Sequence, residues 1–122
     1  MTVRYIFQNQ SSDATGSMLQ AVQNGSIGNP LDVTLEAVML DFKGDFGGGT
    51  CKVKVSSLGP FESPIVWLDA QNPDGAAVTT PVISSAGAIL LRVPSGAYFT
   101  VELTGSTSPD LSVLASGQIK DV

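Results

Sequence analysis

Short segments that alternate apolar and polar residues recur along the chain, and this period of two constrains the fold most. The clearest example is Thr50–Ser57, in which Cys51, Val53 and Val55 share one face of a predicted strand and Lys52 lies on the other. Successive side chains of a strand point to opposite sides, so this pattern predicts one buried and one wet face. That arrangement is typical of an antiparallel sheet.

Similar segments, rich in Val, Ile, Thr and aromatic residues, follow at intervals of about 8 to 12 residues, with Gly, Pro, Asn or Ser between them. After residue 60, the predicted strands are Ile65–Asp69, Ala76–Thr80, Ile83–Ser84, Ile89–Val93, Ala97–Thr104 and Leu111–Ala115. About eight short strands at this spacing, without long helical patterns between them, predict an all-β fold, either a sandwich or a barrel.

Two segments fit both a helix and a strand. Leu31–Phe42 could form an amphipathic helix capped by Asp32, but its Val and Thr residues and its strand neighbours favour a strand. From Val38 onward both faces of this strand are apolar, as expected where a strand is covered on both sides. Ser17–Gln23 could form two helical turns capped by Ser17 or an extended strand, and both alternatives stay open.

The first 30 residues differ in composition from the rest of the chain. Val3–Gln8 is β-branched and aromatic, which predicts a strand or an ordered arm, and glycines and Pro30 punctuate the residues that follow. We therefore divide the chain into residues 1–30, an N-terminal arm or a strand-plus-loop segment, and residues 31–122, a β-sandwich domain.

The composition excludes several functional classes. The chain has no histidine, which excludes imidazole bases, including Ser-His-Asp and Cys-His arrangements, and histidine-containing zinc sites. Six basic residues against eleven acidic ones give a net charge of −5, which argues against a nucleic-acid partner. No apolar run approaches the roughly 18 residues that span a membrane. The N-terminus turns polar after Phe7, so we expect no secretory leader, no membrane partner and synthesis in a cytoplasm.

The remaining chemical motifs are weak. Cys51 is either a buried strand residue or a thiolate activated by nearby lysines, and the strand period favours burial because it places those lysines on the opposite face. Gly44–Gly49 lacks the Gly-Lys-Ser/Thr ending of a phosphate loop and precedes a strand, which predicts a tight connection. Asp69–Gly75 does not match the spacing of an EF-hand loop, although another calcium site using Asp69, Asn72 and Asp74 stays open.

The carboxylates do not single out a catalytic pair, because most of them lie beside turns. We therefore assign no catalytic, cofactor-binding or metal-binding residue, expect no cofactor, and predict that the protein is not an enzyme. Trp67 lies in an apolar run, which favours core or interface packing over a sugar-stacking platform. Phe46 and Phe61 lie in Gly- and Pro-rich loops, where each is either an anchor for a partner or a lid over the sandwich.

Three segments together resemble the small β-sandwich virion proteins of tailed bacteriophages. The first is D-F-K-G-D-F-G-G-G-T-C-K-V-K-V-S-S (Asp41–Ser57), a glycine-rich turn before an alternating strand. The second is P-I-V-W-L (Pro64–Leu68), a strand with a Trp, and the third is R-V-P-S-G-A-Y-F-T-V-E-L-T-G (Arg92–Gly105), a Pro-x-Gly turn leading into a strand. The likeness covers about residues 41–115 and consists of turns and strands rather than a catalytic motif.

This resemblance implies a capsid decoration (cement) protein with a jelly-roll-like antiparallel sandwich and an N-terminal extended arm. It implies the major capsid protein as partner, self-association as a homotrimer, and a location on the capsid surface of the virion. Residues 1–30 are the predicted docking arm, so we expect removal of residues 1–10 to abolish capsid binding and to leave the sandwich folded. The predicted partner-binding residues are Arg4, Tyr5, Phe7, Phe46 and Phe61.

Two alternatives remain. One is a carbohydrate- or receptor-binding module, which would need an exposed aromatic platform such as Trp67 or a loop calcium site. The other is a tail or baseplate component of the same class of phage.

Overall fold

The computed structural model describes residues 2–22, 35–61, 65, 68–69 and 82–121, and within these residues every regular element is a strand. The strands are β1 (Thr2–Gln10), β2 (Ala14–Thr15), β3 (Leu19–Ala21), β4 (Leu35–Asp45), β5 (Thr50–Ser56), β6 (Leu68–Asp69), β7 (Val82–Ile83), β8 (Gly87–Pro94), β9 (Tyr98–Thr104), β10 (Asp110–Gly117) and β11 (Ile119–Asp121). The predicted all-β antiparallel sandwich is therefore confirmed.

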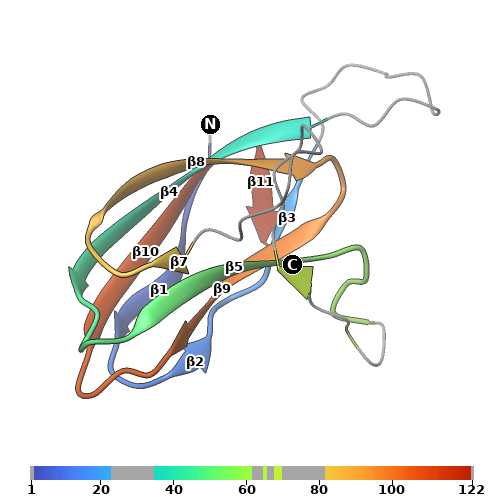
Figure 1. Ribbon diagram of the computed structural model, residues 1–122. Coiled ribbons are helices and arrows are strands. Elements are labelled where there is room, and N and C mark those ends of the chain that lie inside the picture. Colours follow the sequence, from blue (N-terminus) through green and yellow to red (C-terminus); the bar gives the residue numbers. More distant parts are fainter. Residues whose placement is uncertain (1, 23–34, 62–64, 66–67, 70–81, 122) are drawn as a thin grey trace.

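The strands form two antiparallel sheets that pack face to face (Figure 1). One sheet has four strands in the order β1-β10-β4-β8. The other has seven strands and the order β11-β3-β9-β5-β6, with β2 also paired to β9 and β7 also paired to β5. If β2 with β3 and β6 with β7 are each counted as one interrupted strand, the first eight strands have the order 1-8-3-6 in one sheet and 2-7-4-5 in the other. This is a jelly roll.

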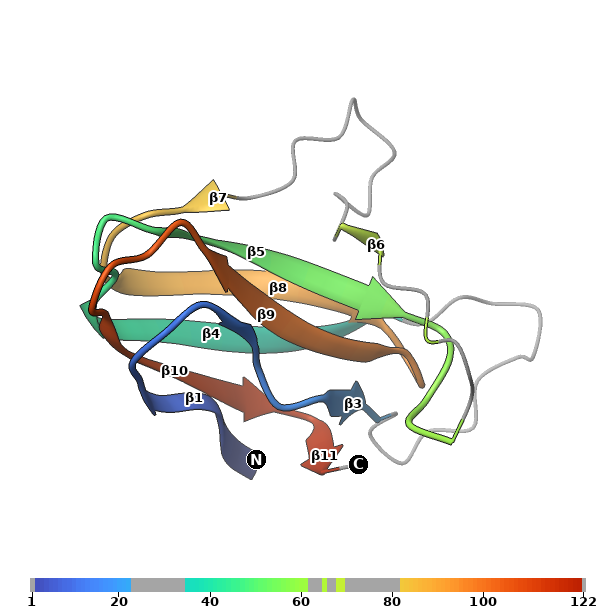
Figure 2. The ribbon, with the colours of Figure 1, turned by 90° about the horizontal axis from the view of Figure 1, so that it is seen from below.

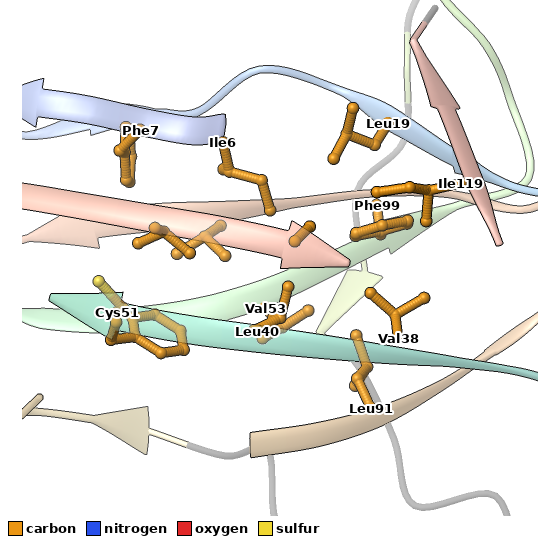
Figure 3. Close-up of a cluster of buried hydrophobic side chains, with 14 of the residues drawn as sticks. Ile6, Phe7, Leu19, Val38, Leu40, Cys51, Val53, Leu91, Phe99 and Ile119 are labelled. Atoms are coloured by element: carbon orange, nitrogen blue, oxygen red, sulfur yellow. The ribbon is translucent and has the colours of Figure 1, made fainter. Parts of the chain in front are cut away.

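Alternating burial along the strands explains why these segments fold as a sandwich. In β4, Val38, Leu40 and Phe42 are buried, whereas the residues between them are exposed or half-buried. In β9, Phe99, Val101 and Leu103 are buried in the same way from the other sheet. Side chains from both layers point toward one another in Figure 3 and form one core. This core supplies the apolar burial that holds the sheets together.

The open edge between β1 and the seven-stranded sheet is closed by residues 16 and 17 and by an ion pair. The amide of Gly16 donates to the carbonyl of Val101 at 2.8 Å, and that of Ser17 donates to Ile6 at 3.0 Å. A Cβ at Gly16 would collide with the side chain of Ile6, so only glycine fits there. Arg4 of β1 also pairs with Asp121 of β11, with an N–O distance of 2.9 Å. The N-terminal strands are thus tied to both layers.

The glycine-rich segment after β4 forms the predicted tight connection to β5. The amide of Gly47 donates to the carboxylate of Asp45 at 2.8 Å, and that of Gly49 donates to the carbonyl of Phe46 at 3.0 Å. Gly47 and Gly48 have φ values of 60° and 77°, which L-residues with a side chain rarely adopt. The turn therefore needs its glycines for backbone geometry rather than for phosphate binding.

The N-terminal extended arm is a prediction that the structure corrects. β1 pairs with β10, and Ile6 and Phe7 belong to the core. The other strands within residues 2–22, β2 and β3, pair with β9. Removing residues 1–10 would take away an edge strand and two core side chains, and the sandwich would not stay intact. Residues 23–30 lie outside the described residues.

The two ambiguous segments both contain strands. Leu19–Ala21 is β3, which decides the Ser17–Gln23 alternative, and Leu35–Asp45 is β4. In the predicted Ile65–Asp69 strand, Leu68–Asp69 is β6, and the predicted Ile83–Ser84 strand corresponds to Val82–Ile83. The predicted strand Ala76–Thr80 lies outside the described residues.

Two adjacent residues of β4 test which side of the strand points into the core. Leu40→Ala removes a fully buried side chain, and we expect the free energy of unfolding to fall by about 2–5 kcal/mol. Met39→Ala, on the outer side, should cost less than about 1 kcal/mol at low protein concentration. Urea unfolding followed by far-UV circular dichroism measures both values. Equal losses of unfolding free energy for the two variants would contradict the placement of Leu40 in the core and Met39 on the outside.

Candidate interaction surface

The two outer faces of the sandwich differ in chemistry. On the outer face of the seven-stranded sheet, β5 and β9 place Lys52 opposite Glu102 and Thr50 opposite Thr104. Thr100 of the same face is buried, and its hydroxyl donates to the carbonyl of Ser17 at 3.0 Å. This face is therefore polar, and opposite charges lie beside each other on it.

The outer face of the four-stranded sheet carries a cluster of exposed apolar side chains. Its exposed large side chains are Val3 (52% exposed), Tyr5 (46%), Met39 (41%) and Leu90 (59%), and Leu114 lies half-buried beside Tyr5. Val3, Met39 and Leu90 lie in one row across the sheet, because Val3 pairs with Ser116, Ser116 with Met39 and Met39 with Leu90. We call this set, Val3, Tyr5, Met39, Leu90 and Leu114, the apolar face. Figure 2 shows the strands that carry it, β1, β10, β4 and β8.

Charged residues lie on both sides of the central row of the apolar face. Asp41 is two residues after Met39 on β4 and pairs with Lys43 at 3.4 Å. Arg92 is two residues after Leu90 on β8, opposite Ala37. Because β4 and β8 are antiparallel, Asp41 and Arg92 lie on opposite sides of the row. Clusters of exposed apolar side chains with a charged rim are typical of protein–protein contact sites.

Two of the five predicted partner-binding residues, Arg4 and Tyr5, are exposed on β1. The structure places Tyr5 in the apolar face, opposite Leu114. The guanidinium of Arg4 is engaged by Asp121 through Nε and by the carbonyl of Val3 through Nη1. Arg4 therefore serves the edge of the sandwich, and Tyr5 is the residue available for a partner.

Phe7 and Phe46 were predicted as partner-binding residues, and the structure corrects both. Phe7 follows Ile6, and a register shift in β1 beside it lets two consecutive side chains enter the core. Phe46 is buried and stacks on Phe42, with 6.1 Å between ring centroids, so it acts as the lid that the sequence left as an alternative.

Phe61, the fifth predicted residue, is 97% exposed in the turn after β5. A large aromatic side chain exposed to this degree gains nothing from burial within its own chain. It is therefore a candidate anchor for a partner, as the sequence predicted.

Cys51 is buried in β5 opposite Leu103. Burial disfavours the thiolate and raises the pKa of Cys51 to about 12. The thiolate hypothesis is therefore wrong, because the lysines of β5 do not offset the loss of solvent.

Sequence reasoning missed a contact between two connections at one end of the sandwich. Asp13, between β1 and β2, accepts hydrogen bonds from the amides of Gly105 and Ser106, both at 2.9 Å, and from the Ser106 hydroxyl. The Ser106 side chain, followed by the backbone amides of Ser106 and Gly105, lowers the pKa of Asp13. No local pattern reveals this contact, because the partners are more than 90 residues apart in the sequence.

The metal and glycan candidates cannot be placed in the structure. Trp67, Asn72 and Asp74 lie outside the described residues, and Asp69 is described as part of β6. Among the described residues, no three Cys, Asp or Glu side chains gather closely enough to hold a metal ion. The described part of the chain contains no helix capable of crossing a membrane.

Comparison with protein-family models finds no match, and comparisons with curated proteins and with solved structures find none either.

The burial of Cys51 predicts how its thiol reacts. With a pKa of about 12 and no solvent contact, it should not react with an aromatic disulfide at pH 7 while the protein is folded. In denaturant, one thiol per chain should react rapidly, which absorbance measures. Native labelling at the rate of the denatured chain would contradict the position of β5.

The contact at Asp13 predicts a pH dependence. Its pKa is lower in the folded chain than the ordinary value of 3.8, so its stabilisation is present above 3.8 and is lost as the pH falls through the folded pKa. We expect Asp13→Ala to lower the free energy of unfolding at pH 7, and the difference from wild type to shrink well below pH 3.8. Urea unfolding across this range measures it, with Asp110→Ala, an exposed acid outside this contact and outside the ion pair of Arg4, as the control. A difference independent of pH would contradict the ionised contact.

Proposed function

We propose that the chain is a structural protein of a tailed-bacteriophage virion, a capsid decoration protein that binds the major capsid protein on the assembled head. The observation that carries the proposal is the jelly-roll order of the two sheets, which is common among viral capsid domains. The turns and strands that resemble phage virion proteins, Asp41–Ser57 and Arg92–Gly105, lie in β4, β5, β8 and β9 of this jelly roll.

Surface chemistry supports a role in protein contact. The apolar face and Phe61 are two separate exposed apolar sites on a surface that is otherwise rich in Ser, Thr and Gly. A decoration protein needs at least two contact sites, because it bridges neighbouring subunits. If the chain binds the assembled shell more tightly than free subunits, binding stabilises that shell by mass action.

Phe61 is the proposed anchor on the capsid. Because aromatic side chains at the centre of an interface often contribute more than 1.4 kcal/mol, we expect Phe61→Ala to weaken binding to heads by about tenfold or more. The measurement is co-sedimentation of purified protein with heads assembled from the major capsid protein alone. Phe61 has almost no contact with its own chain, so the unfolding midpoint should not change.

Val82→Ala is the matched control, since it shortens another exposed apolar side chain, on β7. It should bind heads like wild type. Antibody labelling of intact particles then places the protein within the virion. Labelling of the tail, or failure of the wild-type chain to bind heads, would contradict the decoration role.

A further inference from the structure

We infer that two copies of this chain pair through their apolar faces, related by a two-fold axis that runs along the row Val3–Ser116–Met39–Leu90. This pairing occupies the apolar face in the free protein, and a pair then presents Phe61 twice, once from each copy, as its contacts with the capsid. It stacks two four-stranded sheets face to face, as the two sheets within one chain already do. In a two-fold pair each copy presents the same patch, so the patch must be complementary to itself.

The central row of apolar side chains is complementary to itself under this rotation. Val3, Met39 and Leu90 are 41–59% exposed and lie in register across all four strands, with Ser116 between them on β10. Rotation about the row brings each of these side chains over the same row of the second copy. Tyr5 and Leu114 lie in the next row, which also contains Asp41, so the apolar contact of the pair rests on the central row.

The charges on both sides of the row meet the same condition. Asp41 lies in the row of Tyr5, Leu114 and Ala88, and Arg92 lies in the row of Ala37. The two-fold rotation exchanges these two rows between the copies. Asp41 of one copy therefore faces Ala37 of the second copy. Arg92 of the second copy lies on the neighbouring strand, about 4.8 Å to the side. An arginine side chain spans this offset and can reach the carboxylate. The arrangement occurs twice in the pair, once for each copy.

Charge complementarity is the reason to choose a second copy over another partner. The face contains an acid, Asp41, which also pairs with Lys43 of its own chain, and a base, Arg92. The two-fold axis brings Asp41 of one copy near Arg92 of the other at both ends. Within the described residues, the structure shows no hydrogen bond or ion pair from the Arg92 side chain. On the outer face of the seven-stranded sheet, by contrast, Lys52 and Glu102 already lie opposite each other in one chain.

The area of the apolar face sets the expected affinity of the pair. Four strands span about 19 Å, and the outward rows from Ala37 to Lys43 extend about 20 Å, so the footprint is roughly 400 Å² per copy. A standard stable interface buries about 800 Å² per partner. We therefore expect a reversible pair with a dissociation constant in the micromolar range rather than a permanent dimer.

Sedimentation velocity over a concentration series, at physiological salt, tests the pairing. The wild-type mass should rise from one chain to two as the concentration increases. With Asp41→Arg, positions 41 and 92 are both arginine. With Arg92→Asp, both are aspartate. Each variant should therefore pair at least about tenfold more weakly with itself, because like charges meet across the axis.

Mixing the two variants is the decisive step. One copy with two arginines and one with two aspartates restore both unlike contacts, so the mixture should pair at least as strongly as wild type. Thr104→Arg and Thr104→Asp, on the polar outer face of β9, are the controls and should pair like wild type both alone and mixed. Recovery on mixing also shows that the single variants are folded.

Three results would overturn the inference. A wild-type chain that stays monomeric at millimolar concentration excludes the pair. A mass of three chains, as the resemblance implies, excludes two-fold symmetry. Pairing that survives both single substitutions unchanged, or that mixing does not restore, excludes this face and this axis. Binding to capsid heads does not enter any of these readouts, so failure here is distinct from failure of the decoration role.

Discussion

The register of β4 between β10 and β8 determines both the core and the apolar face. In this register Val38, Leu40 and Phe42 point into the sandwich, and Met39 and Asp41 point outward. A shift of one residue would exchange these two sets of side chains. It would bring the carboxylate of Asp41 into the core, where an unpaired charge is costly. Burial of the inward side chains therefore also determines which side chains of β4 face outward. Among the described residues, no other part of the chain packs on these outward side chains.

The edges of the sandwich depend on contacts that are distant in the sequence. Arg4 and Asp121 join the two sheets at one edge, and Asp13 joins the connections that precede β2 and β10. Gly16 lets the backbone beside β2 approach Ile6 closely. None of these contacts contributes a large buried area. Together they fix the position of β1, whose outer side chains complete the apolar face.

The sequence predicted the elements better than their partners. Alternation identified β5, β8, β9 and β10 to within two residues at every end, because the period of two is visible locally. It did not show that β1 pairs with β10, since that pairing joins the two ends of the chain. For this reason residues 1–30 were predicted as a possible arm, and Phe7 as a partner-binding residue. Phe46 shows the same limit, because a loop aromatic gives no local sign of the ring on which it stacks.

The sequence also contained a signal about the apolar face. The sequence predicts that β4 is covered on both sides from Val38 onward, although of its outward residues there, Met39, Asp41 and Lys43, only Met39 is apolar. The second sheet covers the inner face, but Met39 remains 41% exposed, and its neighbour in register, Leu90, is 59% exposed. Met39 and Leu90 are therefore the part of the outer face that a further layer would cover. A second copy of the four-stranded sheet supplies that layer with the same strand spacing and with opposite charges at the rim.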